Sequence, residues 1–220
     1  MSCLLLVGAG LVYRYAVRDN VFPRNFGVVE PGVLYRSAAL TAASTRHVHD
    51  QYHIKTIIDL GAYAPDSPAE AMAARTAAAL GVQRRVFRLE GDGTGNPNAY
   101  VAALRVIADP TNQPVLVHCS SGAQRTGACV MLYRTIVQGQ NLMGTIYEDS
   151  FRYGHNPRRN TRLAPYLLDY KDRIAQAFRT GSMVAGFEPL DQPPRLAVRG
   201  PSERASPQAS ETTVQAGGPP

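Results

Sequence analysis

Three residue types are scarce in this chain of 220 residues, which has no tryptophan, two lysines and three cysteines. The cysteines, Cys3, Cys119 and Cys129, are odd in number and irregularly spaced, which argues against the paired framework of a disulfide-stabilised secreted domain. No Cys-x-x-Cys pair and no Cys/His set has zinc spacing. An apolar core must therefore stabilise the fold, and a content of 45% apolar and 18% charged residues suits a soluble globular protein.

The histidines do not supply a metal site either. Of His47, His49 and His53, only the last two share a face of a helix, and no pattern of carboxylates completes a cage around them. We interpret these histidines as a solvated helix surface, and we expect neither a metal nor another cofactor.

The scarcity of lysine does not make the chain acidic. Its 23 basic residues, 21 of them arginines, outnumber its 17 acidic residues, so the net charge is +6. A basic surface favours acidic or phosphorylated partners. No run of basic residues and no basic stripe interleaved with aromatics is present, so we expect no nucleic-acid binding.

Long apolar runs are also absent. The longest stretch near the N-terminus, Cys3–Tyr13, has 11 residues, whereas a membrane-spanning helix needs about 20. It lacks the basic start and the cleavage site of a secretory signal. Two interpretations of residues 1–24 stay open: a segment that tethers the protein to a membrane, or an element packed on the domain.

Strands and helices alternate along residues 25–180. Two β-rich runs flank the turn pair Pro31-Gly32 and predict a hairpin. Further strands are predicted at Ile54–Leu60, Val82–Leu89 and Pro114–Cys119, and helices at 41–52, 67–80, from Pro97 onward, 127–137, 142–153 and 163–179. This alternation predicts an α/β fold with a mostly parallel sheet covered by helices on both faces. From Gly181 the chain is rich in Pro, Gly and Ser, which predicts a disordered tail over 181–220.

The strand at 114–119 leads directly into a short polar loop and a helix. Cys119 would emerge at the carboxyl end of this strand, where open α/β sheets bind their ligands. In the loop, Gly122 permits a tight turn whose backbone N–H groups can surround an anion beside a helix N-terminus. Arg125 can donate two hydrogen bonds to phosphate oxygens. The same field would stabilise a thiolate, so the loop can both activate Cys119 and hold the anion that it attacks.

The stretch His118-Cys119-x5-Arg125-Thr126-Gly127 resembles the HCx5R[S/T]G motif of the cysteine-dependent protein tyrosine phosphatase superfamily. With "NFGVVEPGVLYRSAAL" and "IKTIIDL", residues 25–180 look like its compact dual-specificity and bacterial or fungal atypical members. The resemblance implies a sheet of four or five strands and catalysis without a metal.

The resemblance also assigns roles by position. Cys119 would be the nucleophile, Thr126 would hydrogen-bond the departing thiolate, and His118 would orient the loop and help to keep the thiolate ionised. Arg125 and backbone N–H groups would bind the phosphate, in a loop made up of Ser120, Ser121, Gly122, Ala123, Gln124 and Arg125. Cys129, inside the following apolar helix, is expected to be a core residue.

Members of this superfamily take a proton for the leaving group from an aspartate on a mobile loop before the cysteine. Asp92, 27 residues before Cys119 in "LEGDGTGNP", fits this role, and Glu90 is the second candidate. Asp92 could instead be a simple Asp-Gly turn residue. Asp109, followed by a proline, is interpreted as a helix-end turn.

The residues between Cys119 and Arg125 are neutral, which favours a monophosphorylated substrate, phosphotyrosine or a dual-specificity phosphoprotein target, over a polyphosphate. Arg158 and Arg159 keep an inositol phosphate or phytate-like substrate open. Two other functions stay as alternatives: a rhodanese-type sulfurtransferase and a non-catalytic phosphate-binding module. Because a thiolate needs a reducing compartment, we expect the catalytic domain to be cytoplasmic. The sequence gives no indication of the oligomeric state.

Overall fold

The computed structural model describes residues 23–190. Residues 1–22 of the N-terminal segment and residues 191–220 of the predicted tail lie outside this range, and so do the predictions made for them. The described elements are β1 (Gly27–Glu30), β2 (Leu34–Ser37), α3 (Ala42–Tyr52), β3 (Thr56–Asp59), α4 (Pro68–Ala79), β4 (Gln83–Val86), α5 (Pro97–Ala108), the 3₁₀ turn η2 (Pro110–Asn112), β5 (Val115–His118), α6 (Gln124–Ile136), α7 (Leu142–Tyr153) and α8 (Leu163–Thr180).

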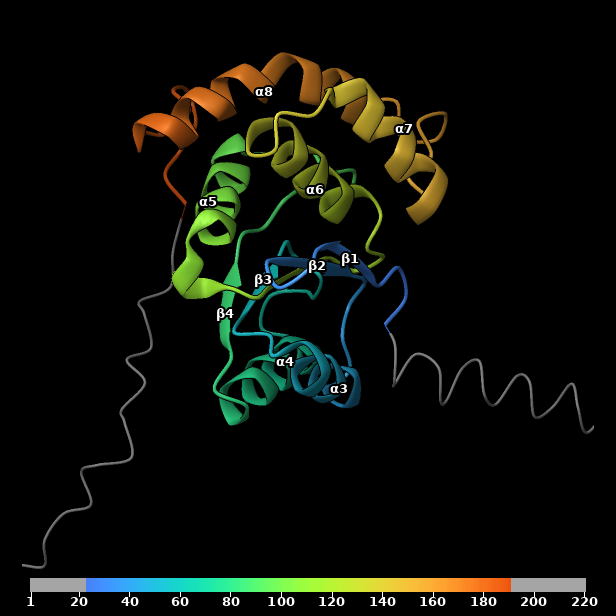
Figure 1. Ribbon diagram of the computed structural model, residues 1–220, viewed down its shortest axis with the longest axis vertical. Coiled ribbons are helices and arrows are strands. Elements are labelled where there is room, and N and C mark those ends of the chain that lie inside the picture. Colours follow the sequence, from blue (N-terminus) through green and yellow to red (C-terminus); the bar gives the residue numbers. More distant parts are fainter. Residues whose placement is uncertain (1–22, 191–220) are drawn as a thin grey trace, which may run out of the picture. The chain divides into compact units, whose positions relative to one another are not determined.

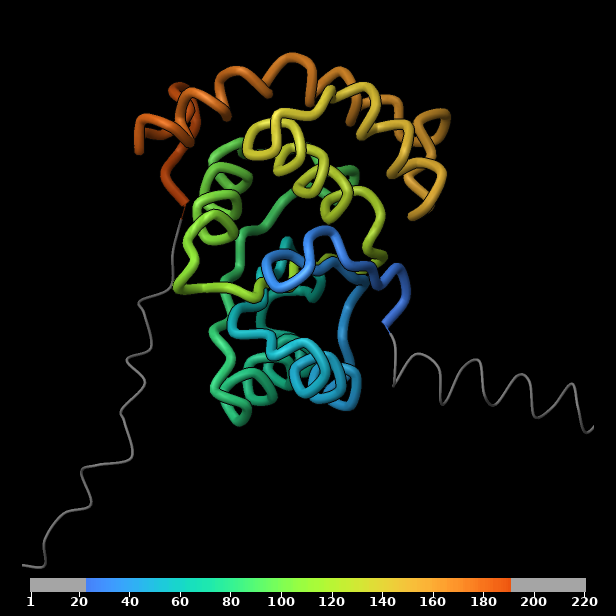
Figure 2. Tube along the Cα trace, in the orientation of Figure 1, coloured from blue at the N-terminus to red at the C-terminus, as the bar shows by residue number. Residues whose placement is uncertain are grey.

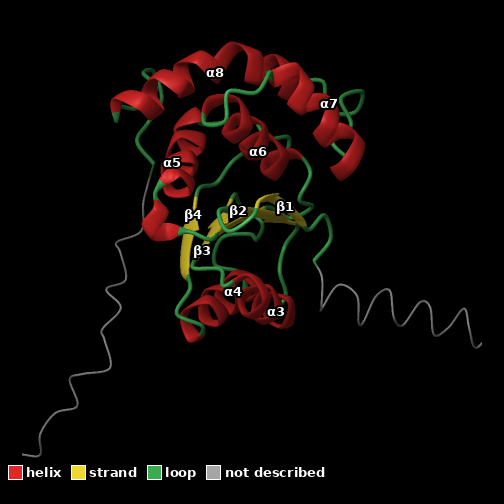
Figure 3. Cartoon of the chain, viewed as in Figure 1, coloured by secondary structure: helices red, strands yellow, loops and turns green. Residues whose placement is uncertain are grey.

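The strands form one five-stranded sheet in the order β1-β2-β5-β3-β4. Only the β1–β2 hairpin is antiparallel, and every other pair is parallel. Helices α3 and α4 cover one face, whereas α5, α6, α7 and α8 lie on the other (Figures 1 and 3). Figure 2 traces the chain from the hairpin into the α3–α4 layer and on to the four later helices. The predicted α/β architecture, a mostly parallel sheet of four or five strands flanked by helices, is confirmed.

The middle of the sheet is where the sequence is most apolar. β5 lies between β2 and β3, and Val115, Leu116 and Val117 are fully buried. A strand in this position is covered on both faces, so it needs an uninterrupted apolar run rather than an alternating one. Packing on both faces therefore holds the carboxyl end of β5 in place, and the next loop starts there.

The predicted boundaries hold to within a few residues, with one shift that matters for the site. α6 begins at Gln124 rather than at Gly127, so Arg125 and Thr126 lie in its first turn. Gly127 is a helical residue here, and a Cβ at this position would collide with the carboxylate of Asp149. This glycine therefore serves close packing of α6 against α7 and does not mark a helix start.

The first ten residues assigned to the tail contact the domain. Val184 is buried and exchanges two hydrogen bonds with Asn98, from its N–H to Oδ1 (2.7 Å) and from Nδ2 to its carbonyl (3.4 Å). Asn96 Nδ2 donates to the Glu188 carbonyl at 2.8 Å. These contacts fix residues 181–190 against α5, because buried side chains and paired backbone groups offset the entropy of ordering.

The helices within 23–190 were compared with the requirements for crossing a bilayer. None of them combines the necessary length and apolar character.

Candidate active site

Cys119 lies directly after β5, as the sequence predicts. The paired residues in the neighbouring strands are Ser37 of β2 and Asp59 of β3, both opposite His118. The Cys119 side chain is 1% exposed, and its Sγ accepts a hydrogen bond from the backbone N–H of Gly122 at 3.3 Å. The loop of residues 119–125, called the phosphate loop below, therefore curls around the sulfur.

The conformation of the phosphate loop depends on Gly122. Its φ is +72°, and a Cβ would lie 2.7–2.8 Å from backbone atoms of Ser37 and Ala38. Only glycine meets both conditions, because the left-handed region is unfavourable for other residues and the neighbouring backbone cannot move aside. The prediction that Gly122 permits a tight turn in this loop is confirmed by its backbone conformation.

Side chains outside the loop hold its carbonyl groups. Arg36 Nη2 donates to the Gly122 carbonyl at 2.7 Å, and Asn25 Nδ2 to the Ser121 carbonyl at 2.8 Å. Across a planar trans peptide the next N–H points the opposite way. Holding the Ser121 carbonyl outward thus turns the Gly122 N–H toward Cys119 Sγ, and holding the Gly122 carbonyl turns the Ala123 N–H into the loop, where it donates to Ser121 Oγ at 3.4 Å.

Arg125 closes the loop from the first turn of α6. It is 8% exposed, and its Nη2 donates to Ser120 Oγ at 2.8 Å. Nη1 donates to the carbonyls of Leu60 (3.1 Å) and Gly61, just after β3. Its Nε is buried without a hydrogen-bond partner in the described part of the chain. A buried guanidinium N–H of this kind is a donor available to an anion.

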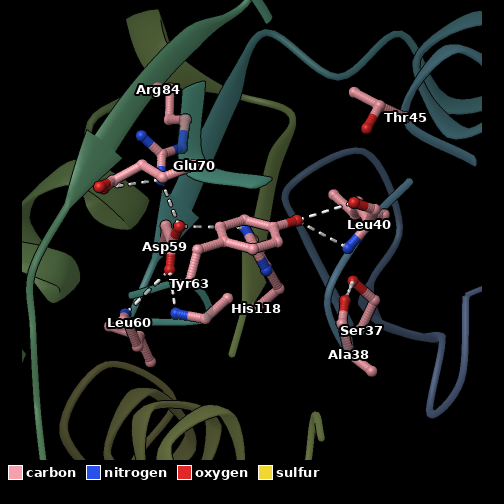
Figure 4. A network of polar contacts seen from close by, with 12 residues as sticks. Ser37, Ala38, Leu40, Thr45, Asp59, Leu60, Tyr63, Glu70, Arg84 and His118 are labelled. Carbon is pink, nitrogen blue, oxygen red and sulfur yellow. Dashed lines mark hydrogen bonds and ion pairs between the residues drawn. The ribbon is translucent and has the colours of Figure 1, made fainter. Parts of the chain in front are cut away.

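The turn that receives Arg125 is built by Asp59 at the end of β3 (Figure 4). Asp59 Oδ1 accepts from the N–H groups of Gly61 (2.8 Å) and Ala62 (2.6 Å), and Oδ2 from Arg84 (2.5 Å). Burial alone would raise the pKa of Asp59. The fields of His118 and Arg84 and these hydrogen bonds outweigh it, so the pKa lies below its usual value.

His118 lies beneath the same turn. Its Nε2 is 4.0 Å from Asp59 Oδ2, and its ring meets the ring of Tyr63 at 5.9 Å between centroids. Tyr63 donates in turn to the Leu40 carbonyl at 2.7 Å (Figure 4). Burial lowers the pKa of His118, although Asp59 opposes this shift. A buried, fully packed imidazole suits a supporting role under the loop rather than contact with a ligand.

The two remaining motif residues differ in their surroundings. Thr126 is fully buried, and its Oγ1 has no hydrogen-bond partner within residues 23–190. Cys129 is packed in the apolar core, where burial raises the pKa of its thiol to about 12. Its predicted core role is confirmed.

Asp92 lies in a second loop, residues 90–95, called the acid loop below. Its Oδ1 accepts from the N–H (3.0 Å) and Oγ1 (2.7 Å) of Thr94, and Oδ2 pairs with Arg162 at 2.9 Å. Burial raises the pKa of Asp92, but the Thr94 bonds and the Arg162 charge outweigh it, so its pKa is lowered. Asp92 thus forms the Asp-Gly turn and also keeps its carboxylate partly exposed, with 25% of the side chain accessible. Glu90 is exposed on the same loop.

The two loops are joined by side chains from the segment between α7 and α8. Asn160 Nδ2 donates to the Asp92 carbonyl (2.6 Å) and to Gln124 Oε1 (2.8 Å). His155 Nδ1 lies 2.6 Å from the same Oε1. Asp109, by contrast, caps η2 by accepting from the Thr111 N–H at 2.9 Å, which confirms its interpretation as a turn residue.

Sequence reasoning missed Arg36, Asn25 and Asn160. The only available signal was an arginine inside the otherwise apolar run "GVLYRSAAL", since a charged residue is rarely buried without a partner. Within residues 23–190, no group of three or more His, Cys, Asp or Glu side chains is placed to hold a metal ion.

Comparison with known proteins places this geometry in a family. Residues 20–180 match the profile of the tyrosine phosphatase family. The inositol diphosphatase SIW14 of Saccharomyces cerevisiae is 24% identical over 161 residues, covering 70% of this chain and 54% of SIW14. The tyrosine-protein phosphatase-like protein OCA2 of the same yeast is 30% identical over 128 residues, covering 57% of this chain and 64% of OCA2. The match thus spans less than two thirds of either relative.

Solved structures share the fold. The core catalytic domain of SIW14, in complex with citrate, superposes with a TM-score of 0.58 at 22% identity, covering 73% of this chain and 95% of that domain. TpbA of P. aeruginosa in complex with phosphotyrosine gives a TM-score of 0.58 at 23% identity, covering 76% of this chain and 95% of TpbA. The motif, the fold and the family profile agree, and the chain belongs to the tyrosine phosphatase family.

Proposed function

We propose that the protein hydrolyses phosphomonoesters through a cysteinyl-phosphate intermediate. One observation supports this most strongly: the Cys119 sulfur lies inside a loop in which the Gly122 N–H points at it and which Arg125 closes with an unpartnered Nε. This is an anion site built around a nucleophile.

In the first step the Cys119 thiolate attacks phosphorus, the S–P bond forms, and the bond from phosphorus to the ester oxygen breaks. The inward N–H groups and Arg125 stabilise the charge on the phosphoryl oxygens, the main source of acceleration in phosphoryl transfer. In the second step water attacks phosphorus and the thiolate leaves. The buried Thr126 hydroxyl is available to hydrogen-bond the departing sulfur, and His118 supports the loop from below.

The leaving oxygen needs a proton, which we assign to Asp92. In the described conformation Thr94 and Arg162 hold this carboxyl in its charged form. A bound phosphate dianion would compete for Arg162 and disfavour a second negative charge nearby, and both effects raise the pKa of Asp92. We therefore expect the acid loop to rearrange when substrate binds. Glu90 is the alternative donor.

We assign phosphoproteins, with phosphotyrosine first and dual specificity included, as the substrates. The neutral side chains from Ser120 to Gln124 support a single phosphate. Inositol phosphates are the second candidate, because SIW14 is named as an inositol diphosphatase and because Arg158, Arg159 and Arg162 are exposed near the acid loop.

The test is a panel of substrates assayed without added metal: phosphotyrosine and phosphothreonine peptides, inositol phosphates, an activated aryl phosphate, and thiosulfate with cyanide. We expect aryl phosphate and phosphotyrosine hydrolysis. Sulfur transfer without phosphate release would establish the sulfurtransferase instead, and phosphate binding without turnover would establish a binding module. A preference for inositol phosphates would change the substrate class that we assign but leave the proposed roles of Cys119 and Arg125 unchanged.

We also propose that residues 25–180, with the packed segment 181–190, form the catalytic domain and work in the reducing cytoplasm. Residues 1–24 keep both interpretations, a membrane tether or an element packed on the domain. Cell fractionation of the full chain and of a variant lacking the first 20 residues tests this. An unchanged distribution after the deletion would remove the tether.

A further inference from the structure

Helix α7 exposes an apolar face. Met143, Tyr147 and Phe151 are spaced four residues apart, so they lie on one side of the helix, and they are 56%, 77% and 85% exposed. α6 lies between α7 and the sheet (Figure 1). Exposed aromatic side chains of this size on one helix face are typical of a binding surface.

A groove of about 380 Å³ runs beside this face, lined by Tyr147, Ser150, Phe151 and residues 154–157. Its lining includes His155, which is 2% exposed and whose Nδ1 is bonded to Gln124 Oε1 at 2.6 Å. Gln124 is a residue of the phosphate loop. One imidazole ring thus separates the groove from the loop that holds the reacting phosphate.

Basic residues adjoin the groove lining in sequence. Arg152 follows Phe151, Arg158 and Arg159 follow Pro157, and all three are exposed. The exposed acidic residue of this segment, Glu148, already pairs with Arg134 at 2.9 Å and with Arg152 at 3.6 Å. An apolar groove with arginines next to its lining residues complements a ligand that combines an apolar side chain with negative charge.

We propose that this groove docks the phosphoprotein substrate by an apolar or aromatic side chain next to the phosphorylated residue, with acidic neighbours on the adjoining arginines. The inference rests on the proposed function and deepens it. In an inositol phosphate each ring carbon carries a hydroxyl or a phosphate group. Such a ligand has no apolar side chain to place in the groove. The surface therefore favours protein over inositide as substrate.

The experiment compares two phosphotyrosine peptides that differ only in a leucine or a serine near the phosphotyrosine, scanned over the flanking positions. The double variant Tyr147→Ser/Phe151→Ser is measured beside Met72→Ser, a matched exposed apolar residue (48%) on α4, across the sheet. We expect the double variant to lower kcat/KM for the leucine peptide about tenfold, mostly through KM, because the lost contact is uniform binding. The serine peptide, the aryl phosphate and the Met72→Ser variant should change less than about twofold.

Three results for the double variant would overturn the docking groove. An equal loss of kcat/KM on the aryl phosphate would mean that the active site is damaged, and unchanged kcat/KM on both peptides would mean that the substrate does not use this face. A loss of binding to anionic lipid vesicles, with peptide kinetics unchanged, would make the face a membrane-binding surface. In each case aryl phosphate hydrolysis by the wild type still supports the proposed chemistry. Absence of that hydrolysis would refute the chemistry itself.

A second observation concerns the buried contacts between β2, the phosphate loop and α7. Arg36 is fully buried and contacts three groups: the Gly122 carbonyl (2.7 Å), the Asp149 carboxylate, and the face of the Tyr153 ring, 3.7 Å from its centroid. Buried arginine–carboxylate pairs seldom add net stability, so the position of the Gly122 carbonyl is the more telling consequence. We infer that Arg36 is a positioning residue: it holds the Gly122 carbonyl outward, and the Ala123 N–H of the same peptide therefore points into the loop, where it lies 3.4 Å from Ser121 Oγ.

The test is the pH dependence of Cys119 alkylation by iodoacetamide, with kcat and thermal melting measured in parallel. Arg36→Lys keeps the charge but loses the planar fork. We expect its alkylation profile to move to higher pH and kcat to fall about tenfold, less than the 10²–10³-fold typical of a lost direct donor. Asp149→Asn, which removes the buried negative charge, should not move the profile upward.

A purely structural Arg36 would lower the melting temperature without moving the alkylation profile, and this result would overturn the inference. If Arg36→Lys does not fold, Asn25→Ala serves in its place, because it removes the matching bond to the Ser121 carbonyl. An unchanged profile in Asn25→Ala would then contradict the role of these carbonyl contacts.

Discussion

The phosphate loop and the acid loop carry neighbouring parts of one proposed reaction, yet they are built differently. The phosphate loop is held at its carbonyls by Arg36 and Asn25, closed by Arg125, and shaped by a glycine that no other residue can replace. The carbonyls of the acid loop have similar anchors, Tyr100 to Gly93 at 2.6 Å and Tyr166 to Gly95 at 3.0 Å, but its Asp92 carboxylate is held by Thr94 of the same loop and by Arg162, which is 74% exposed.

This difference matches what each loop must do. Donors that stabilise developing charge work best when they are already in place, because no reorganisation is needed during the reaction. A proton donor on a covering loop must instead move with the substrate. Gly93 and Gly95, both at positive φ, give the acid loop backbone freedom on either side of Thr94.

The most severe change removes the proposed nucleophile, the Cys119 sulfur, from the phosphate loop. We expect Cys119→Ser to lower turnover by a factor on the order of 10⁴ or more while phosphate binding persists, because the loop keeps its donors. Aryl phosphate kinetics and isothermal titration with inorganic phosphate measure the two quantities. Cys129→Ser is the matched control and should retain activity; substantial turnover by Cys119→Ser would exclude it as the nucleophile.

The next change tests the acid loop. Asp92→Asn should slow hydrolysis about 10²–10⁴-fold for phosphotyrosine peptide, and less for an activated aryl phosphate, whose leaving group needs no proton. A series of aryl phosphates with different leaving-group pKa values measures this. Glu90→Gln is the control on the same loop. A uniform loss across the series would mean that Asp92 only positions the loop, and Glu90 would become the donor.

A pair of glycine substitutions compares a constrained turn with an open one. Gly139→Ala, at φ +71° with no neighbour within 4 Å, should cost about 1–2 kcal/mol of unfolding free energy from backbone strain alone. Gly122→Ala adds a collision with Ser37 and Ala38, so we expect about 2–5 kcal/mol and loss of activity. Urea denaturation gives both values. Equal costs would show that the backbone at 37–38 can move aside.

The smallest expected effect concerns the Arg162–Asp92 pair. Asp92 must be protonated to act as an acid, and Arg162 lowers its pKa. Arg162→Ala should therefore move the basic limb of the kcat/KM profile to higher pH. The shift should be less than about one unit, because the arginine is 74% exposed and screened by solvent and salt. Arg152→Ala, 62% exposed and paired with Glu148, is the control and should leave the limb in place.

Local patterns predicted the elements of the fold well, and the boundaries less well. The apolar run at 114–119 and the alternation of strands and helices led to the parallel sheet, since each depends on residues close in sequence. The start of α6 was placed three residues late at Gly127, because the need for a glycine there comes from Asp149 on another helix. The contacts of residues 181–190 with α5 were missed for the same reason.

For the site, the sequence by itself determined the strand, the loop and the helix that carry Cys119, Gly122, Arg125 and Thr126. These residues lie within eight positions of one another, and their spacing dictates an anion-binding turn. Only the tertiary structure decided what holds them: the Arg36–Asp149 pair joins positions 113 residues apart, and Asn160 reaches the acid loop across 68. The state of Asp92 has both origins, because the Thr94 hydrogen bonds that contribute most to lowering its pKa are local, whereas the ion pair comes from Arg162, beyond α7. Contacts between distant segments depend on how the helices pack, and no local pattern encodes that packing.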